Sequence, residues 1–169
     1  MEIKAPLGDL DRARAAVARL GARAAGTMEQ VDRYYELADG RRLKLRTVPG
    51  RAAELISYRR PETSGVRVSE YEVTPVRDGD ACIVPRSRPL VIVRKCRELH
   101  LIDNVRVHLD AVDGLGSYLE LEAVIDPAHD EATCRRQVAD ITRALGIADE
   151  SLIRASYAEL LLEAGTCRR

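Results

Sequence analysis

Residues 104–122, NVRVHLDAVDGLGSYLELE, decide the fold, because they predict two β-strands joined by a glycine-containing turn. Apolar and polar residues alternate along both strands, with Leu109 on the first and Leu119 and Leu121 on the second. Alternation with a period of two gives each strand one apolar and one polar face. The apolar faces coincide only if Leu109 lies beside Leu119 or Leu121, and this register requires a loop with an odd number of residues. The glycines of residues 113–116, DGLG, suit the positive φ angles of a bulged turn.

The polar faces of the same two strands gather three carboxylates. Asp110 belongs to the first strand, and Glu120 and Glu122 belong to the second. Like charges on facing strands destabilise a sheet. We therefore expect a cation among them, either a metal ion, or arginines, or both. His108 shares this face and is expected to line it rather than to bind a metal, because no second histidine lies at a metal-binding spacing.

The composition predicts one domain, residues 1–169, with an aliphatic core, because 46% of the residues are apolar but phenylalanine and tryptophan are absent. The formal net charge is zero, which argues against nucleic acid or an anionic membrane as a partner. The four cysteines are scattered without a CxxC pair. No signal-peptide pattern or long apolar run occurs, so we expect a cytoplasmic protein.

Lysine is rare in this chain. There are 24 arginines but only three lysines, at positions 4, 44 and 95. Where arginine is the default basic residue, a retained lysine marks a position that suits a compact ammonium group better than a planar guanidinium. Lys4, Lys44 and Lys95 all lie in predicted strands, so we treat them as candidate functional residues.

The rest of the chain predicts more short antiparallel strands, interrupted by a few helices. Strands are expected over 1–5, 27–38, 41–48, 53–60, 66–75 and 90–101, and helices over about 10–20, 131–145 and 156–163. Residues 78–86 are compatible with a short helix. Many regularly spaced strands favour a sandwich or a barrel, so the expected fold class is α+β and mainly β.

Two of these strands carry several basic residues on one face. They are Arg42, Lys44 and Arg46 on the strand 41–48, and Lys95 and Arg97 on the strand 90–101. One interpretation is a solvated outer face with mixed charges. The other is a wide barrel with a polar interior, in which these cations face the carboxylates of residues 104–122 across a tunnel. Such a tunnel suits a polyanion with a divalent metal ion, and periodicity alone leaves both interpretations open.

An ordered set of short motifs runs through nearly the whole chain. They are EIK at 2–4, QVDRYY at 30–35, RLKLR at 42–46, SYRRP at 57–61, VRKCR at 93–97, DAVDGLG at 110–116 with LELE at 119–122, and SY at 156–157 before LL at 160–161. Together they resemble the CYTH superfamily, the triphosphate tunnel metalloenzymes, which include class IV adenylate cyclases and thiamine triphosphatases. The resemblance implies an eight-stranded antiparallel barrel that encloses a charged tunnel, with flanking helices.

The resemblance also implies roles for individual residues. It assigns Mg²⁺ or Mn²⁺ to Glu2, Glu120 and Glu122, with Asp110 joining or supporting them; catalytic roles to Lys4, Lys95 and Arg97; and triphosphate binding to Lys44, Arg46, Arg59, Arg106 and Arg42. The first glutamate of the family's ExExK motif would lie before Met1, so either a ligand is missing or the chain starts short. The inward face of the strand 66–73 stays open between Glu70 with Glu72 and the face of Tyr71.

We therefore expect a metal-dependent enzyme that acts on a nucleoside or organic triphosphate. The first interpretation is class IV-type conversion of ATP to cyclic AMP and pyrophosphate. One alternative is a triphosphatase for thiamine triphosphate, a nucleoside triphosphate or inorganic tripolyphosphate; another is a non-catalytic module that binds a phosphorylated ligand. A charged tunnel suits all three, because phosphoryl chemistry depends mainly on positioning and charge neutralisation. The sequence does not define the oligomeric state; a homodimer is suggested only by analogy, because related proteins are often dimeric.

Overall fold

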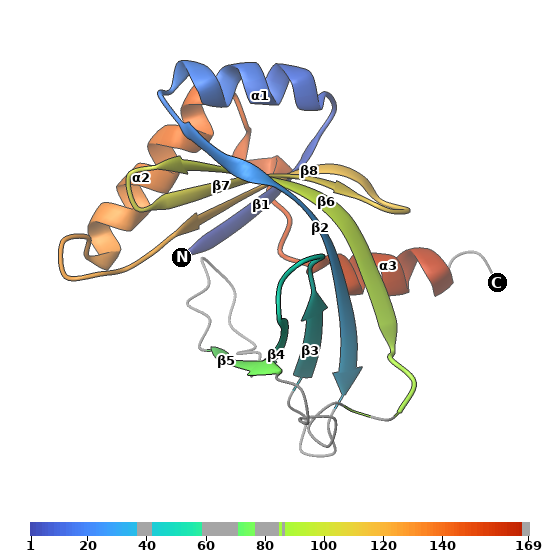
Figure 1. Ribbon diagram of the computed structural model, residues 1–169. Helices are drawn as coiled ribbons and strands as arrows, with labels where there is room; N and C mark the ends of the chain where they lie inside the picture. Colours follow the sequence, from blue (N-terminus) through green and yellow to red (C-terminus); the bar gives the residue numbers. More distant parts are fainter. Residues whose placement is uncertain (37–41, 59–70, 77–84, 86, 167–169) are drawn as a thin grey trace.

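The computed structural model describes residues 1–36, 42–58, 71–76, 85 and 87–166 (Figure 1). Its elements are β1 (Glu2–Leu7), α1 (Leu10–Arg19), β2 (Arg23–Glu36), β3 (Arg42–Thr47), β4 (Ala53–Tyr58), β5 (Tyr71–Val76), β6 (Val91–Ile102), β7 (Val105–Val112), β8 (Gly116–Ala123), α2 (Glu131–Ala144), a 3₁₀-helix (Asp149–Ser151) and α3 (Tyr157–Thr166). The strands form one antiparallel sheet of eight strands in the order β1-β8-β7-β6-β2-β3-β4-β5. The mainly β, α+β fold class is thus confirmed.

The β7–β8 hairpin has the register that its sequence predicts. Leu109 pairs with Leu119, and the turn between the paired Val112 and Gly116 contains three residues. Gly114 and Gly116 have φ angles of 76° and 98°, values that favour glycine because it has no Cβ atom. The odd loop therefore places Leu109, Leu119 and Leu121 on one face of the hairpin.

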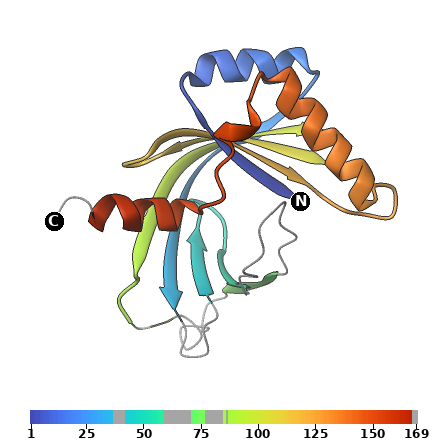
Figure 2. The ribbon, with the colours of Figure 1, turned by 180° about the vertical axis from the view of Figure 1, so that it is seen from behind.

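That apolar face is covered by α1 and α2 (Figures 1 and 2). Asp9 caps α1 by accepting a hydrogen bond from the Arg12 backbone N–H at 3.0 Å, and Asp130 caps α2 in the same way. Val17 of α1 and Val138 of α2 pack in one core with apolar residues of β7 and β8. Three leucines of this core, at positions 109, 119 and 121, are at most 1% exposed, and burying each contributes about 1.5–3 kcal/mol.

The third helix, α3, packs on the opposite, polar face of the sheet. Tyr157 and Ala158, at its start, form a second buried cluster with Val93, Val112 and Tyr118. Side chains alternate along a strand, so Tyr118 points away from the face that carries Leu119 and Leu121. The polar face of the sheet is therefore partly enclosed by α3.

The sheet is strongly curved, and β2 and β6 bend along their length (Figure 1). A β-bulge between Ala24 and Gly26 of β2, with Gly26 at a φ angle of 118°, contributes to this bend. Closure into a barrel was expected, but within the described ranges β1 and β5 lie at the two ends of the strand order and do not pair. The observed architecture is thus a curved eight-stranded sheet.

Several element bounds differ from the prediction. β1 continues through Pro6 to Leu7, because an end strand tolerates a residue without a backbone N–H. β2 begins at Arg23, four residues earlier than expected. Most of the predicted segment 78–86, and residues 66–70 of the predicted strand 66–75, lie outside the described residues. None of the helices in the described part is long and apolar enough to span a membrane.

Candidate functional site

A band of charged and polar residues crosses the face of the sheet that is opposite α1 and α2. Six neighbouring strands contribute to it through alternating positions: Glu2 and Lys4 from β1, Glu120 and Glu122 from β8, Arg106, His108 and Asp110 from β7, Lys95 and Arg97 from β6, Gln30 and Asp32 from β2, and Lys44 and Arg46 from β3. We call this set the charged band. It brings together all the predicted site residues except Arg42, discussed below, and Arg59, which lies outside the described residues.

Asp110 is fully buried at the centre of the charged band. Arg97 donates to it from Nε at 2.7 Å and from Nη2 at 2.5 Å, and Lys95 Nζ donates at 3.2 Å. The Tyr157 hydroxyl donates a fourth hydrogen bond at 2.9 Å. Burial by itself raises the pKa of Asp110, but Arg97 and Lys95 lower it below its usual value. The carboxylate is therefore charged and fully engaged by protein donors.

Glu120 lies beside this cluster and joins it to β1. Lys4 Nζ is 3.0 Å from Glu120 Oε1, and Arg97 Nη2 donates to Oε2. These cations hold the pKa of Glu120 well below its usual range, although burial by itself raises it. His108 Nδ1 lies 3.6 Å from Glu120 Oε2 and, in the described structure, has no hydrogen-bond partner. Burial lowers the pKa of His108, so this ring is neutral at neutral pH.

The two remaining glutamates lie at the more exposed end of the band. Glu2 and Glu122 are directly paired across β1 and β8, and their side chains are 45% and 28% exposed. Arg106 Nη1 donates to both oxygens of Glu122 at 3.3 Å, whereas Lys4 Nζ is 3.9 Å from Glu2. Desolvation and the Glu120 carboxylate raise the pKa of Glu2, although water reaches much of this side chain and screens part of the effect. This end of the band is therefore short of positive charge.

The donor set at this end fits a hard divalent cation in its chemistry. Mg²⁺ and Mn²⁺ prefer carboxylate oxygens, and the raised pKa of Glu2 indicates negative charge that a cation would offset. Glu2, Glu120 and Glu122 share one face, but in the part of the chain that the structure describes no three potential ligands converge on a single point. Asp110 and Glu120 are both already paired with protein cations, and Asp110 has the larger set of donors, from Arg97, Lys95 and Tyr157.

A second buried aspartate, Asp32, organises the other half of the band. Arg46 donates to it from Nε at 2.9 Å and from Nη2 at 3.1 Å, and Gln30 Nε2 donates at 2.9 Å. Lys44 Nζ lies 3.8 Å from the same carboxylate. Burial raises the pKa of Asp32, but Lys44 and Arg46 outweigh it and bring the pKa to about 2. No role was predicted for Asp32 from the sequence, and the available signal was its position on the same face of the strand as Gln30.

The start of α3 is the other feature that sequence reasoning missed. The Tyr157 ring lies against two lysines of the charged band, with Lys4 Nζ 4.4 Å and Lys95 Nζ 4.9 Å from its centroid. Lys4 Nζ also donates to the Ala155 carbonyl at 3.4 Å. Tyr157 thus contacts Asp110 and both lysines, although it lies far from them in sequence. Only the motif SY at 156–157 hinted at this placement.

The other predicted residues lie at the margins. Arg42 forms an ion pair with Glu159 of α3 at 3.4 Å, and Arg106 is at the exposed end with a side chain 46% exposed. Glu72 pairs with Ser57 and is exposed; it lies on the sheet face opposite Lys44, since Lys44 pairs with Ile56 and Ile56 with Val73. The face of β5 that carries Val73 is therefore the one on the same side of the sheet as the charged band.

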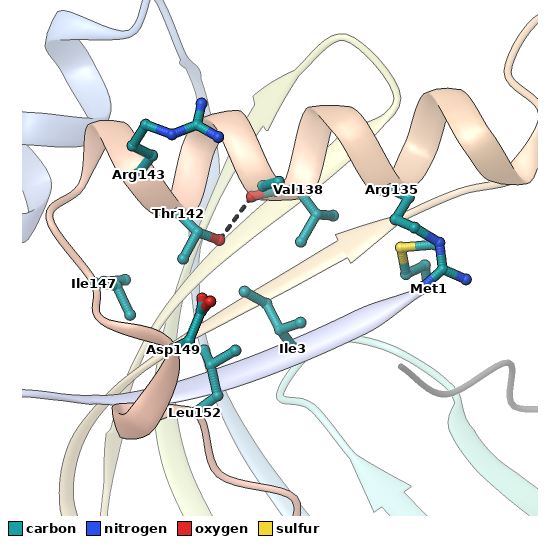
Figure 3. Close-up of a pocket in the computed structure, with 10 residues that line it drawn as sticks. Met1, Ile3, Arg135, Val138, Thr142, Arg143, Ile147, Asp149 and Leu152 are labelled. Carbon is teal, nitrogen blue, oxygen red and sulfur yellow. Dashed lines mark hydrogen bonds between the residues drawn. The ribbon is translucent and has the colours of Figure 1, made fainter. Parts of the chain in front are cut away.

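A hollow of about 460 Å³ lies on the other side of β1, between this strand and α2 (Figure 3). Its floor is apolar and includes Ile3 and Val138. Two arginines at its rim, Arg135 and Arg143, are paired with acidic residues of their own helix at 2.6 and 2.8 Å. Because Ile3 and Lys4 point to opposite faces of β1, this hollow is separate from the charged band.

The chain belongs to the CYTH domain family, whose model matches residues 1–157. Among curated proteins, it is 35% identical over 68 residues to one from Methanocaldococcus jannaschii named "Putative adenylate cyclase". That match spans 40% of this chain and 39% of the relative.

Solved structures share the fold over nearly the whole chain. The PH1012 protein of Pyrococcus horikoshii has a TM-score of 0.77 at 23% identity, with 95% of this chain and 98% of that chain covered. A protein from Vibrio parahaemolyticus, described as a "putative adenylate cyclase", has a TM-score of 0.74 at 18% identity and coverage of 95% and 96%. HpAC1 of Hippeastrum, a "putative adenylyl cyclase" described as having a dominant triphosphatase activity, has a TM-score of 0.68 at 17% identity and coverage of 96% and 95%. Because the sequence identities are 23% or lower, these structural similarities establish the fold alone.

Proposed function

We propose that the charged band binds the triphosphate group of a nucleoside or organic triphosphate together with Mg²⁺ or Mn²⁺. We further propose that the protein is an enzyme that converts ATP to cyclic AMP and pyrophosphate. The observation that carries this proposal is the pair of Lys-x-Arg sequences, on β3 and β6, whose side chains are fixed on one sheet face by two buried aspartates. Membership of the CYTH family and the names of the relatives support it.

The excess of positive charge in the band supports an anionic ligand. Among the described residues, five largely buried cations, namely Lys4, Lys44, Arg46, Lys95 and Arg97, are accompanied by three buried carboxylates, namely Asp32, Asp110 and Glu120. Burial lowers the pKa of Lys44 and of Lys95, and the positive charges of Arg46 and Arg97 lower these pKa values further. Phosphate oxygens would offset this positive charge through charge-assisted hydrogen bonds.

Each group of residues has a distinct task in the proposed reaction. Lys4, Lys95 and Arg97 contact the reacting phosphates, and Lys44 and Arg46 hold the rest of the triphosphate chain. Glu2, Glu120 and Glu122 would hold the metal ion, which when bound supplies neutralisation of charge on the phosphate oxygens. Asp110 supports the site by orienting Arg97 and Lys95, because its own oxygens are already engaged.

Cyclisation and hydrolysis place different demands on the same cations. In cyclisation the ribose 3′-oxygen forms a bond to the α-phosphorus, the bond to pyrophosphate breaks, and the hydroxyl proton is released. In hydrolysis a water molecule forms a bond to the γ-phosphorus, the bond from that phosphorus to the bridging oxygen breaks, and the diphosphate leaves while inorganic phosphate and a proton are released. Both reactions require a fixed triphosphate with neutralised charge. A triphosphatase is therefore our second candidate, favoured by the described activity of HpAC1, which shares this fold.

The test is incubation of the pure protein with ATP and Mn²⁺, followed by chromatography of the products. Cyclic AMP with pyrophosphate supports the first candidate, and release of inorganic phosphate without cyclic AMP supports the second. The matched variants are Arg97→Gln, in the band, and Arg135→Gln, on the opposite side of β1; only the first should abolish turnover. Calorimetry with tripolyphosphate then covers the third case, since metal-dependent binding without turnover indicates a binding module, and no binding at all refutes the proposal.

A further inference from the structure

The two Lys-x-Arg pairs of the charged band are held by the same kind of arrangement. Asp110 accepts hydrogen bonds from both cations of the β6 pair and from one neutral donor. Asp32 accepts two hydrogen bonds from Arg46 and lies 3.8 Å from Lys44, and Gln30 supplies the neutral donor at 2.9 Å. The repetition indicates that Asp32 does for the β3 pair what Asp110 does for the β6 pair.

We propose that Asp32 is a positioning residue that fixes the guanidinium of Arg46 and holds the ammonium of Lys44 beside it, so that both cations reach one anionic ligand. The inference rests on the proposed function, because the anionic ligand is the triphosphate. Asp32 is 2% exposed and already bonded to Arg46 and Gln30, so it acts through its neighbours rather than by contact with the ligand.

The register of β2 and β3 explains how one carboxylate serves both cations. Asp32 is directly paired with Arg46, and the next residue on the same face, Tyr34, is paired with Lys44. Lys44 also lies with its Nζ 5.8 Å from the centroid of the Tyr34 ring. The two cations therefore stand side by side along β3, where their mutual repulsion must be offset.

The groups around Lys44 show what Asp32 contributes. Burial lowers the pKa of Lys44 most strongly, and Arg46 and Lys95 lower it further. Asp32 raises it, with a smaller contribution from Glu120, and the balance is about 8. Without the Asp32 charge, the ammonium would lose its proton closer to neutral pH, and the ligand would lose one cationic partner.

Because the chain has only three lysines, the first experiment is direct. Nuclear magnetic resonance of protein labelled at lysine Cε gives three signals, and the signal that disappears in Lys44→Arg belongs to Lys44. In the unaltered protein this signal should titrate near pH 8. In Asp32→Asn the midpoint should fall by about one pH unit, whereas the exposed control Asp140→Asn should leave it unchanged. An unchanged midpoint in Asp32→Asn would overturn the proposal.

The second experiment measures binding of inorganic tripolyphosphate by calorimetry. If the Lys44 midpoint falls by about one pH unit, the affinity loss caused by Asp32→Asn should be roughly sixfold larger at about pH 8.5 than at about pH 6.5. At the higher pH Lys44 is mostly unprotonated in the variant, and the anionic ligand requires the protonated ammonium group. Adding Lys44→Arg, which stays charged, should abolish this pH dependence. An equal loss at both pH values would mean that Asp32 has only a structural role.

These two experiments separate the inference from the proposed function. If tripolyphosphate does not bind to the unaltered protein, the proposed function fails, but the titration still tests the link between Asp32 and Lys44. If Asp32→Asn does not fold, as judged by circular dichroism, Arg46→Met replaces it. That variant removes the Arg46 charge and leaves Lys44 as the β3 cation beside Asp32, with Gln30 still donating to the carboxylate. The Lys44 midpoint should therefore rise above about 8, and the absence of a rise would contradict the proposed coupling.

Discussion

Replacement of Asp110 by asparagine should destabilise the fold more than any other single acid-to-amide change in the charged band. The change keeps the side-chain shape but removes the charge that Arg97 and Lys95 share, and it places an amide N–H₂ group where the carboxylate accepts four hydrogen bonds. Removing one partner of a buried ion pair costs about 3–5 kcal/mol, because the other charge stays buried and unpaired.

The lower end of that range applies at this site. Arg97 keeps a second acceptor in Glu120, and the lowered pKa of Lys95 makes loss of its proton less costly than for an ordinary lysine. We therefore expect a decrease of about 3 kcal/mol in the free energy of unfolding, which for a chain of this size lowers the midpoint temperature by roughly 6–12 °C.

Thermal unfolding monitored by circular dichroism measures this effect, with the exposed Asp140→Asn as the control. The sign of the pH dependence follows from the lowered pKa of Asp110. Its stabilising contribution is complete above the ordinary aspartate pKa and is lost as the pH falls through the lower folded-state pKa. The difference in unfolding temperature between the unaltered protein and Asp110→Asn should therefore disappear at acidic pH. If Asp110→Asn unfolds at the same temperature as the control at neutral pH, the buried network does not stabilise the fold as argued.

Three further outcomes are expected. Tyr157→Phe, which removes one hydrogen bond to Asp110, should lower the free energy of unfolding by about 1 kcal/mol in denaturant titrations. An unchanged free energy of unfolding would contradict a stabilising role for this hydrogen bond. His129, whose pKa is raised by Asp126, stabilises the fold below its ordinary pKa and loses this effect as the pH rises through the higher folded-state value; the stability difference from His129→Gln should therefore vanish in alkali. Tripolyphosphate at about one hundred times its dissociation constant should stabilise the protein by about 2.7 kcal/mol, whereas an unshifted unfolding temperature would exclude binding.

The sequence predicts those parts of the fold whose information is local. The β7–β8 register follows from alternation and an odd loop, and it is confirmed by the pairing of Leu109 with Leu119. The helices α1 and α2 follow from their capping aspartates and apolar stripes. Closure of the sheet depends on contacts between β1 and β5, which are far apart in sequence, and local patterns carry no information on it.

The same limit applies to the site. The lysines were found because they are rare, and Asp110, Glu120 and Glu122 because alternation places them on one strand face, whereas Glu2 was assigned only through the family resemblance. Tyr157 was not found, because its contact with Asp110 spans 47 positions and depends on how α3 returns to the sheet. No sequence feature distinguishes Asp32 from an ordinary surface residue, because a charged residue on a strand face is usually solvated.

The exposure of the charged residues argues against the first interpretation, a solvated outer face. On a solvated outer face, lysines and arginines extend into water, yet Lys4, Lys95 and Arg97 are only 5–8% exposed. Burying such groups is unfavourable unless they are paired, and here the pairing is incomplete, because cations outnumber carboxylates along the band. A fold gains no stability from an unmatched buried charge. Its retention is understandable if an anion completes the pairing, and this is the physical reason for expecting a phosphate ligand on this face.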